Sequence, residues 1–65
     1  MQSQYQKILN HLIDEGSISG LEAAELYRVR ALPRRIADLR EAGFEIESEW
    51  RTDPVGQRYK KYWLA

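Results

Sequence analysis

The spacing of apolar residues changes once along the chain, near Gly43, and this change restricts the fold more than any other feature. Before Gly43, apolar side chains recur every three or four residues, as they do on the buried face of a helix. After it, three apolar residues and one serine alternate with glutamates, as on a half-buried strand (Phe44, Ile46, Ser48 and Trp50). A single change from helical to strand spacing predicts an α+β fold in which helices precede a sheet.

Two serine caps predict the first two helices. Ser3 and Gln6 have capping-box spacing, which predicts a helix over residues 4–15 that ends at Gly16. Its expected buried stripe leaves His11 on the polar side and contains five apolar residues (Tyr5, Ile8, Leu9, Leu12 and Ile13). Ser19 and Glu22 form a second capping box, which opens a short helix that ends near Tyr27.

A third helix is predicted between a turn at residues 28–30 and Gly43. Leu32, Ile36 and Leu39 recur at i, i+4 and i+7, which places them on one face. Pro33 suits the first helical turn, where its missing N–H costs nothing, so the helix begins somewhere between residues 30 and 33.

The C-terminal part predicts a hairpin. Residues 51–57 contain Asp53-Pro54 and Gly56, which are typical of a loop, and residues 58–64 read as a second strand. We expect Tyr62 and Leu64 to face the core opposite Phe44 and Ile46, and both tryptophans to pack in the core or across the hairpin. Residues 17–18 form a short link. The prediction is therefore one domain over residues 1–65, with three helices followed by a two-stranded antiparallel hairpin.

Composition excludes several classes of protein. The chain of 65 residues has no cysteine, which excludes disulfides and thiolate metal sites and favours a reducing cytoplasm. No apolar run approaches the roughly 18 residues that span a membrane, and the N-terminal residues 1–4 lack the pattern of a signal peptide. We expect a soluble cytoplasmic protein with no membrane partner.

The net charge is zero, from ten basic and ten acidic residues, but the charges occur in blocks. Residues 28–40 hold five arginines against Asp38 alone, and a second basic block flanks the hairpin loop. Acidic residues dominate residues 1–27 and recur at the start of the hairpin as Glu45, Glu47 and Glu49. Such alternation along the chain can fold into a molecule with one positive side.

Two features resemble the winged helix-turn-helix family. One is the order of these elements, and the other is the run from Ser19 to Gly43, which contains the segment Arg35-Ile-x-x-Leu-Arg-x-x-Gly. The run and the closing Tyr62-Trp63-Leu64 are similar to small helix-turn-helix proteins of phages and prophages. The resemblance implies that the third helix enters the major groove of double-stranded DNA and that the hairpin, or wing, touches the backbone. It also implies a role as a transcriptional regulator or an excisionase-like protein, acting at the nucleoid. The family's glycine after the second helix is replaced here by Arg28.

Arginines of the third helix are the candidates for reading bases. The expected inward triplet leaves five residues on or near the outer side (Arg30, Arg34, Ala37, Asp38 and Glu41), with Arg35 on the flank. The candidates for base contacts are Arg30, Arg34 and Arg35. Arginine can bind guanine bidentately, and Asp38 can accept from a cytosine amino group or pair with Arg34. Arg40 lies near the C-terminal end of the helix, where a positive charge is stabilised, so we expect it to have a structural role. The predicted DNA-binding residues are Arg28, Arg30, Arg34, Arg35 and Asp38, with Arg51, Arg58, Lys60 and Lys61 as phosphate anchors.

Other functions remain open at this stage. The arginines can form an ordinary solvated face, and the acidic strip of the hairpin can bind a protein, which makes a protein-interaction module the alternative. No catalytic arrangement, cofactor motif or small-molecule site stands out, and a lone His11 makes a metal site unexpected. A module this small reads few base pairs, so specificity calls for a homodimer or adjacent copies on DNA.

Overall fold

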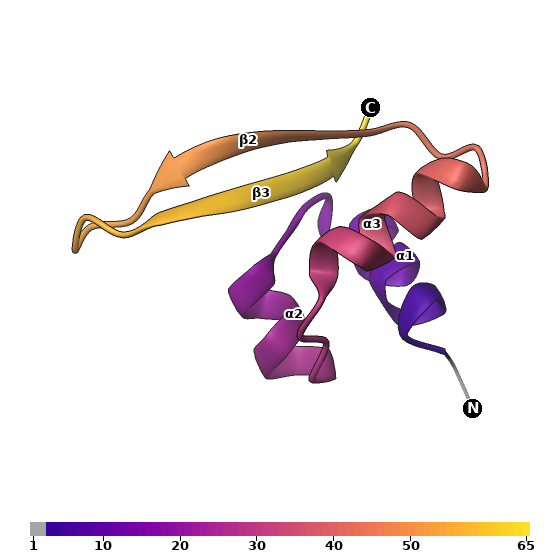
Figure 1. The fold of residues 1–65 in the computed structure, drawn as a ribbon, viewed down its shortest axis with the longest axis horizontal. Coiled ribbons are helices and arrows are strands. Elements are labelled where there is room, and N and C mark those ends of the chain that lie inside the picture. Colours follow the sequence, from indigo (N-terminus) through magenta and orange to yellow (C-terminus); the bar gives the residue numbers. More distant parts are fainter. Residues whose placement is uncertain (1–2) are drawn as a thin grey trace.

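The computed structural model describes residues 3–65, so Met1 and Gln2, which belong to the stretch considered above for a signal peptide, lie outside the described residues. Helices form one part of the molecule, and a long hairpin extends from them (Figure 1). Within residues 3–65, no helix is long and apolar enough to cross a membrane. The elements in chain order are α1 (Gln4–Glu15), β1 (Ile18–Ser19), α2 (Gly20–Tyr27), α3 (Leu32–Glu41), β2 (Ile46–Thr52) and β3 (Arg58–Leu64).

The predicted caps set the ends of the first two helices. The Ser3 hydroxyl accepts the Gln6 N–H at 3.2 Å, and Gly16 ends α1 in a left-handed conformation. At the start of α2 the capping box is complete, because the Ser19 hydroxyl accepts the Glu22 N–H at 3.3 Å and the Glu22 carboxylate accepts the Ser19 N–H at 3.2 Å. The sequence prediction of these boundaries is confirmed.

The turn between α2 and α3 depends on a left-handed residue that is not glycine. Arg28 has φ 57° and ψ 31°. Its N–H donates to the Ala24 carbonyl at 3.0 Å, and the Val29 N–H donates to the Ala23 carbonyl at 3.1 Å. The first of these bonds is the 5→1 bond of an αL C-cap, which normally has glycine at the position of Arg28. Arg28 therefore adopts the glycine geometry, and the buried side chain of Val29 fixes the turn against the core.

We expect Arg28→Gly to raise the free energy of unfolding by about 0.5–1 kcal/mol, because a left-handed conformation costs a residue with a Cβ about 1–2 kcal/mol and the extra freedom of glycine in the unfolded chain offsets part of the gain. Urea denaturation measures the change. Arg30→Gly is the matched control, since Arg30 lies in the same turn without a positive φ, and it should be neutral or destabilising. Equal destabilisation by both variants would show that Arg28 is not strained.

The sheet has one strand more than predicted. Its order is β1-β3-β2 and all pairs are antiparallel, with Ile18 opposite Tyr62 and Ile46 opposite Leu64. Ile18, which the sequence placed in the link at residues 17–18, is thus the first residue of a short strand that pairs with β3. The predicted fold class is confirmed, and the two-stranded sheet is corrected to three strands because β1 joins the helical part to the hairpin.

The core lies between the helices and the part of the sheet nearest to them. Tyr62 and Ile46 are buried, and Phe44 and Leu64 pack against the same cluster, as the alternation predicted. The expected pairing is wrong for Tyr62, which lies opposite Ser48 because the register is shifted by two residues, whereas Leu64 lies opposite Ile46. The helices contribute most of the other buried apolar residues (Ile8, Leu9, Leu12, Ala23, Leu32, Ile36 and Leu39).

Two expectations about α1 are wrong. His11 is buried, whereas Ile13 is 62% exposed. His11 follows Ile8 by three residues and therefore shares its face. The hydroxyl of Tyr27 lies 2.7 Å from His11 Nδ1, and a Glu22 carboxylate oxygen lies 3.6 Å from Nε2. These partners from α2 allow the imidazole ring to be buried at a position that the polar/apolar pattern predicted to be exposed to solvent.

The two tryptophans contact the hairpin rather than the core. Trp63 is half-buried and donates from Nε1 to a Glu47 carboxylate oxygen at 3.2 Å. Trp50 is 59% exposed and lies against Arg58 and Lys60 of the neighbouring strand. The expected packing across the hairpin is confirmed for both, whereas a core position for Trp50 is wrong, because its cross-strand partner is the charged Lys60 and this part of the hairpin is open to solvent.

Candidate nucleic-acid interface

One face of α3 is free of the core. Leu32, Ile36 and Leu39 are buried, as predicted. Arg34 and Ala37 are exposed, and the helical period places them opposite the buried triplet. No ion pair within residues 3–65 involves Arg34. The exposed face of α3 therefore presents a guanidinium group beside a small side chain, with the exposed Glu41 two turns further along the same face.

The two flanks of α3 differ. Arg40 donates from Nε and Nη2 to the Ile46 carbonyl oxygen, at 3.2 and 2.8 Å, which ties one flank to the hairpin and confirms the structural role expected for this residue. On the other flank, Arg35 Nη2 lies 3.3 Å from a carboxylate oxygen of Asp38. Asp38 thus pairs with Arg35 rather than with Arg34, which the spacing also allowed.

The hairpin separates its charges by face. The register places Trp50 opposite Lys60 and Thr52 opposite Arg58, on the face that also carries the buried Ile46 and Tyr62. We call this the front face; its other strand residues are Ser48 and Leu64. Alternate residues form the back face (Glu47, Glu49, Arg51, Tyr59, Lys61 and Trp63). All the strand carboxylates of the hairpin therefore lie on the back face, while Glu45 precedes β2 and is exposed.

The cations of the back face are paired with carboxylates. Arg51 Nε lies 2.6 Å from Glu49 Oε1, and Lys61 Nζ lies 3.6 Å from Glu22 Oε1. On the front face, by contrast, Arg58 and Lys60 make no ion pair within the described chain, and they lie 5.2 and 5.7 Å from the centroid of the Trp50 ring. The predicted block of four hairpin cations is thus divided into two paired and two unpaired members.

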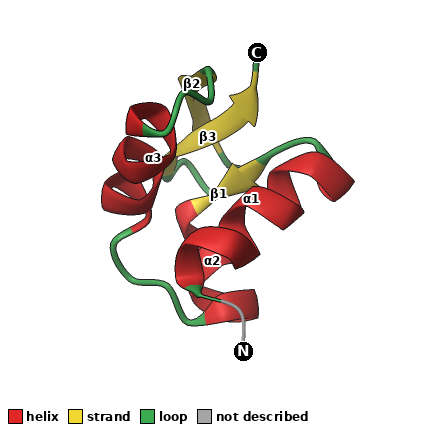
Figure 2. Ribbon diagram, turned by 90° about the vertical axis from the view of Figure 1, so that its right-hand side faces the viewer, coloured by secondary structure: helices red, strands yellow, loops and turns green. Residues whose placement is uncertain are grey.

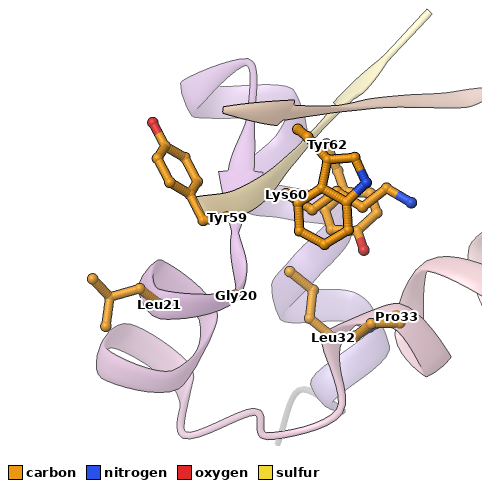
Figure 3. Close-up of a pocket in the computed structure, with 8 residues that line it drawn as sticks. Gly20, Leu21, Leu32, Pro33, Tyr59, Lys60 and Tyr62 are labelled. Carbon is orange, nitrogen blue, oxygen red and sulfur yellow. The ribbon is translucent and has the colours of Figure 1, made fainter. Parts of the chain in front are cut away.

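The unpaired cations lie on three segments around the start of α3. The turn that carries the exposed Arg28 and Arg30 lies on one side of this start and the hairpin on the other (Figures 1 and 2). Pro33, the neighbour of Arg34, and Lys60 line the same pocket (Figure 3). The turn, α3 and the hairpin therefore each carry positive groups without an ion pair in the described residues, and the turn and the hairpin both adjoin the start of α3.

A family model described as a winged helix-turn-helix domain matches residues 3–65. The chain belongs to the winged helix-turn-helix family. Neither a search of curated proteins nor a search of solved structures finds a significant match. By order along the chain, α3 stands at the place of the recognition helix of helix-turn-helix proteins, and the β2–β3 hairpin stands at the place of the wing, so we call this hairpin the wing. The family supports DNA binding as the general function, and its members are typically not enzymes.

Sequence reasoning missed the exposed aromatic side chain of this winged helix-turn-helix domain. Trp50 was expected to continue the buried series of Phe44 and Ile46. One signal pointed the other way: pairing the strands across the loop at 53–57 places Trp50 opposite Lys60 and not opposite an apolar residue. A lysine as cross-strand partner indicates that this part of the front face is open to solvent.

Proposed function

We propose that the protein binds double-stranded DNA sequence-selectively, with α3 in the major groove and the wing on the flanking backbone. One observation carries this proposal: the turn, α3 and the front face of the wing, three segments that adjoin the start of α3, carry cations without ion pairs in the described residues, whereas the strand carboxylates of the wing lie on its back face. Such a surface attracts the phosphate backbone, and the net charge of zero does not oppose it because the charges are separated.

Each segment has its own role in the proposal. Arg34 reads a guanine, since its planar fork matches the O6 and N7 acceptors, and Ala37 allows close approach to a thymine methyl group. Phosphate contacts, which set the register without reading sequence, are assigned to four residues (Arg28, Arg30, Arg58 and Lys60).

The ion-paired residues are weaker candidates. Arg35 and Asp38 stay candidates for base contacts on the flank of α3 away from the wing, but DNA must compete with their mutual pairing. Arg51 can contact a phosphate only after its ion pair with Glu49 breaks, and Lys61 only after its ion pair with Glu22 breaks. The proposal therefore does not depend on these residues.

The similarity to phage and prophage proteins supports a role as a small transcriptional regulator or an excisionase-like protein in a bacterial cell. A recognition helix of this length reads few base pairs, so we propose that dimers or adjacent copies share one DNA site. The cytoplasm, at the nucleoid, is the compartment that this role requires.

Selection from a random duplex library with the purified protein tests the proposal. We expect an enriched motif of a few base pairs that contains a guanine, in one copy or in regularly spaced copies. An absence of enrichment, together with an affinity for duplex that does not change with salt, would contradict DNA binding.

The salt dependence of duplex affinity should distinguish the two faces of the wing. Each phosphate contact contributes about −0.9 to the slope of log K against log salt concentration. We expect Lys60→Ala to reduce this slope by about one contact. Lys61→Ala, the matched control from the neighbouring position on the back face, should leave the slope unchanged. The opposite result would place the DNA on the back face.

The alternative is a protein-interaction module that uses the back face. Its acidic strip is partly engaged within the wing, because Glu47 accepts from Trp63 and Glu49 pairs with Arg51. The ion pair of Glu49 leaves less free negative charge for a partner, and this favours the DNA-binding proposal.

A further inference from the structure

A pocket of about 450 Å³ lies between the wing and the starts of α2 and α3 (Figure 3). Leu21 contributes from the first turn of α2, and Leu32 and Pro33 contribute from the first turn of α3. The wing contributes Trp50 and three residues of β3 (Tyr59, Lys60 and Tyr62). The pocket thus adjoins the surface proposed to face DNA.

The lining of this pocket does not match a DNA backbone. Three aromatic and three apolar residues line it together with a single charged residue, Lys60. The ring of Tyr59, which belongs to the back face, points away from Tyr62 and Leu32 (Figure 3). Trp50 and Leu21 are 59% and 67% exposed, so much apolar surface stays in contact with water. Sugars and phosphates are polar and would not remove this apolar surface from water. A nucleobase is flat and apolar on both faces, and it stacks on aromatic side chains.

The charges beside the pocket suit the backbone on either side of such a base. Arg58 and Lys60 lie against the ring of Trp50, and neither is held by a carboxylate within residues 3–65. A base that enters the pocket brings its two neighbouring phosphates with it. The same two cations can then neutralise these phosphates while Trp50 contacts the base.

We propose that this pocket receives an unstacked base of the bound DNA, so that the protein prefers a duplex with an unpaired base beside the wing over a fully paired duplex. The inference rests on the proposed DNA binding and extends it from duplex recognition to recognition of a local distortion. Moving a base out of the helix is least costly when that base has no partner. The preference should therefore appear for a bulge or a mismatch.

The test compares a fully paired duplex with the same duplex carrying one unpaired 2-aminopurine, whose position is moved stepwise through the flank next to the binding site. The full chain is titrated with each duplex. We expect about tenfold tighter binding when the unpaired base reaches the wing, with quenching of the 2-aminopurine fluorescence by stacking.

Two tryptophan variants identify the pocket. Trp50→Ala should remove both the preference and the quenching while it still binds the paired duplex. Trp63→Phe, on the back face, should retain both, and it leaves Trp50 as the sole tryptophan, whose own emission should fall on binding. Circular dichroism checks that both variants fold.

The outcomes separate this inference from the proposed function. Equal affinity for paired and unpaired duplexes, with the salt dependence intact, overturns the inference and leaves DNA binding in place. A preference that persists in Trp50→Ala also overturns it, because flexibility of the DNA then explains the effect. If the unmodified protein binds no DNA at all, both the proposed function and this inference are overturned. The pocket would then not be assigned to a base, and a peptide side chain would be the alternative occupant.

Discussion

Arg34→Ala is expected to weaken binding to the selected duplex by about 5- to 150-fold, which corresponds to about 1–3 kcal/mol for the loss of one bidentate base contact. Arg34 lies on the face of α3 opposite the buried triplet and has no ion pair within the described chain. Its guanidinium group therefore reaches DNA without first breaking a contact. Fluorescence anisotropy with a labelled duplex measures the change.

Arg35→Ala is the matched control. Arg35 neighbours Arg34 in sequence, but its guanidinium group is held by Asp38 on the flank of α3 away from the wing. We expect Arg35→Ala to weaken binding to the selected duplex by less than fivefold. Arg34→Lys should lose much of the preference for guanine but keep the charge, because an ammonium lacks the planar fork. If Arg34→Ala binds as tightly as the unmodified protein while Arg35→Ala does not, the other flank of α3 faces the groove.

Leu39→Ala is expected to unfold most of the protein. Leu39 is fully buried in the core, and truncating a buried leucine costs about 2–5 kcal/mol through lost burial and the cavity left behind. A core of this size supplies only about 3–5 kcal/mol of net stability, so the loss is comparable to the whole. Urea denaturation followed by circular dichroism measures it.

Leu26→Ala provides the comparison, since Leu26 is 60% exposed. A surface substitution of this kind changes stability by about 0.5 kcal/mol or less. Similar denaturation midpoints for Leu39→Ala and Leu26→Ala would mean that α3 does not pack as described. DNA binding by Leu39→Ala should be lost in proportion to the unfolded fraction, which separates its effect from that of Arg34→Ala.

The local rules of helix formation predicted the fold well. Ser3, Ser19 and Gly16 mark ends of helices through backbone contacts within a few residues, and the spacing of Leu32, Ile36 and Leu39 gives one face directly. Such features depend on neighbours in sequence, so a single sequence contains them. The position of Arg28 was identified as unusual in the same way, although its left-handed conformation required the structure.

Features that depend on distant partners were not predicted. His11 is buried because Tyr27 and Glu22 of another helix reach it, and the polar/apolar pattern of α1 contains no sign of them. The division of the wing cations depends on register: Lys60 and Lys61 are adjacent in sequence, but the strand period points them to opposite faces. The block of charge was visible in the sequence, whereas its separation into paired and unpaired members was not.

The order of the sheet also constrains how the chain is made. The ribosome produces β3 after every other element, yet β3 is the middle strand and joins both β1 and β2. The pairing of Ile18 with Tyr62 spans most of the chain and has to wait until the last strand has left the exit tunnel. The helices therefore emerge before the surface that covers them, and the domain closes only after translation has passed β3.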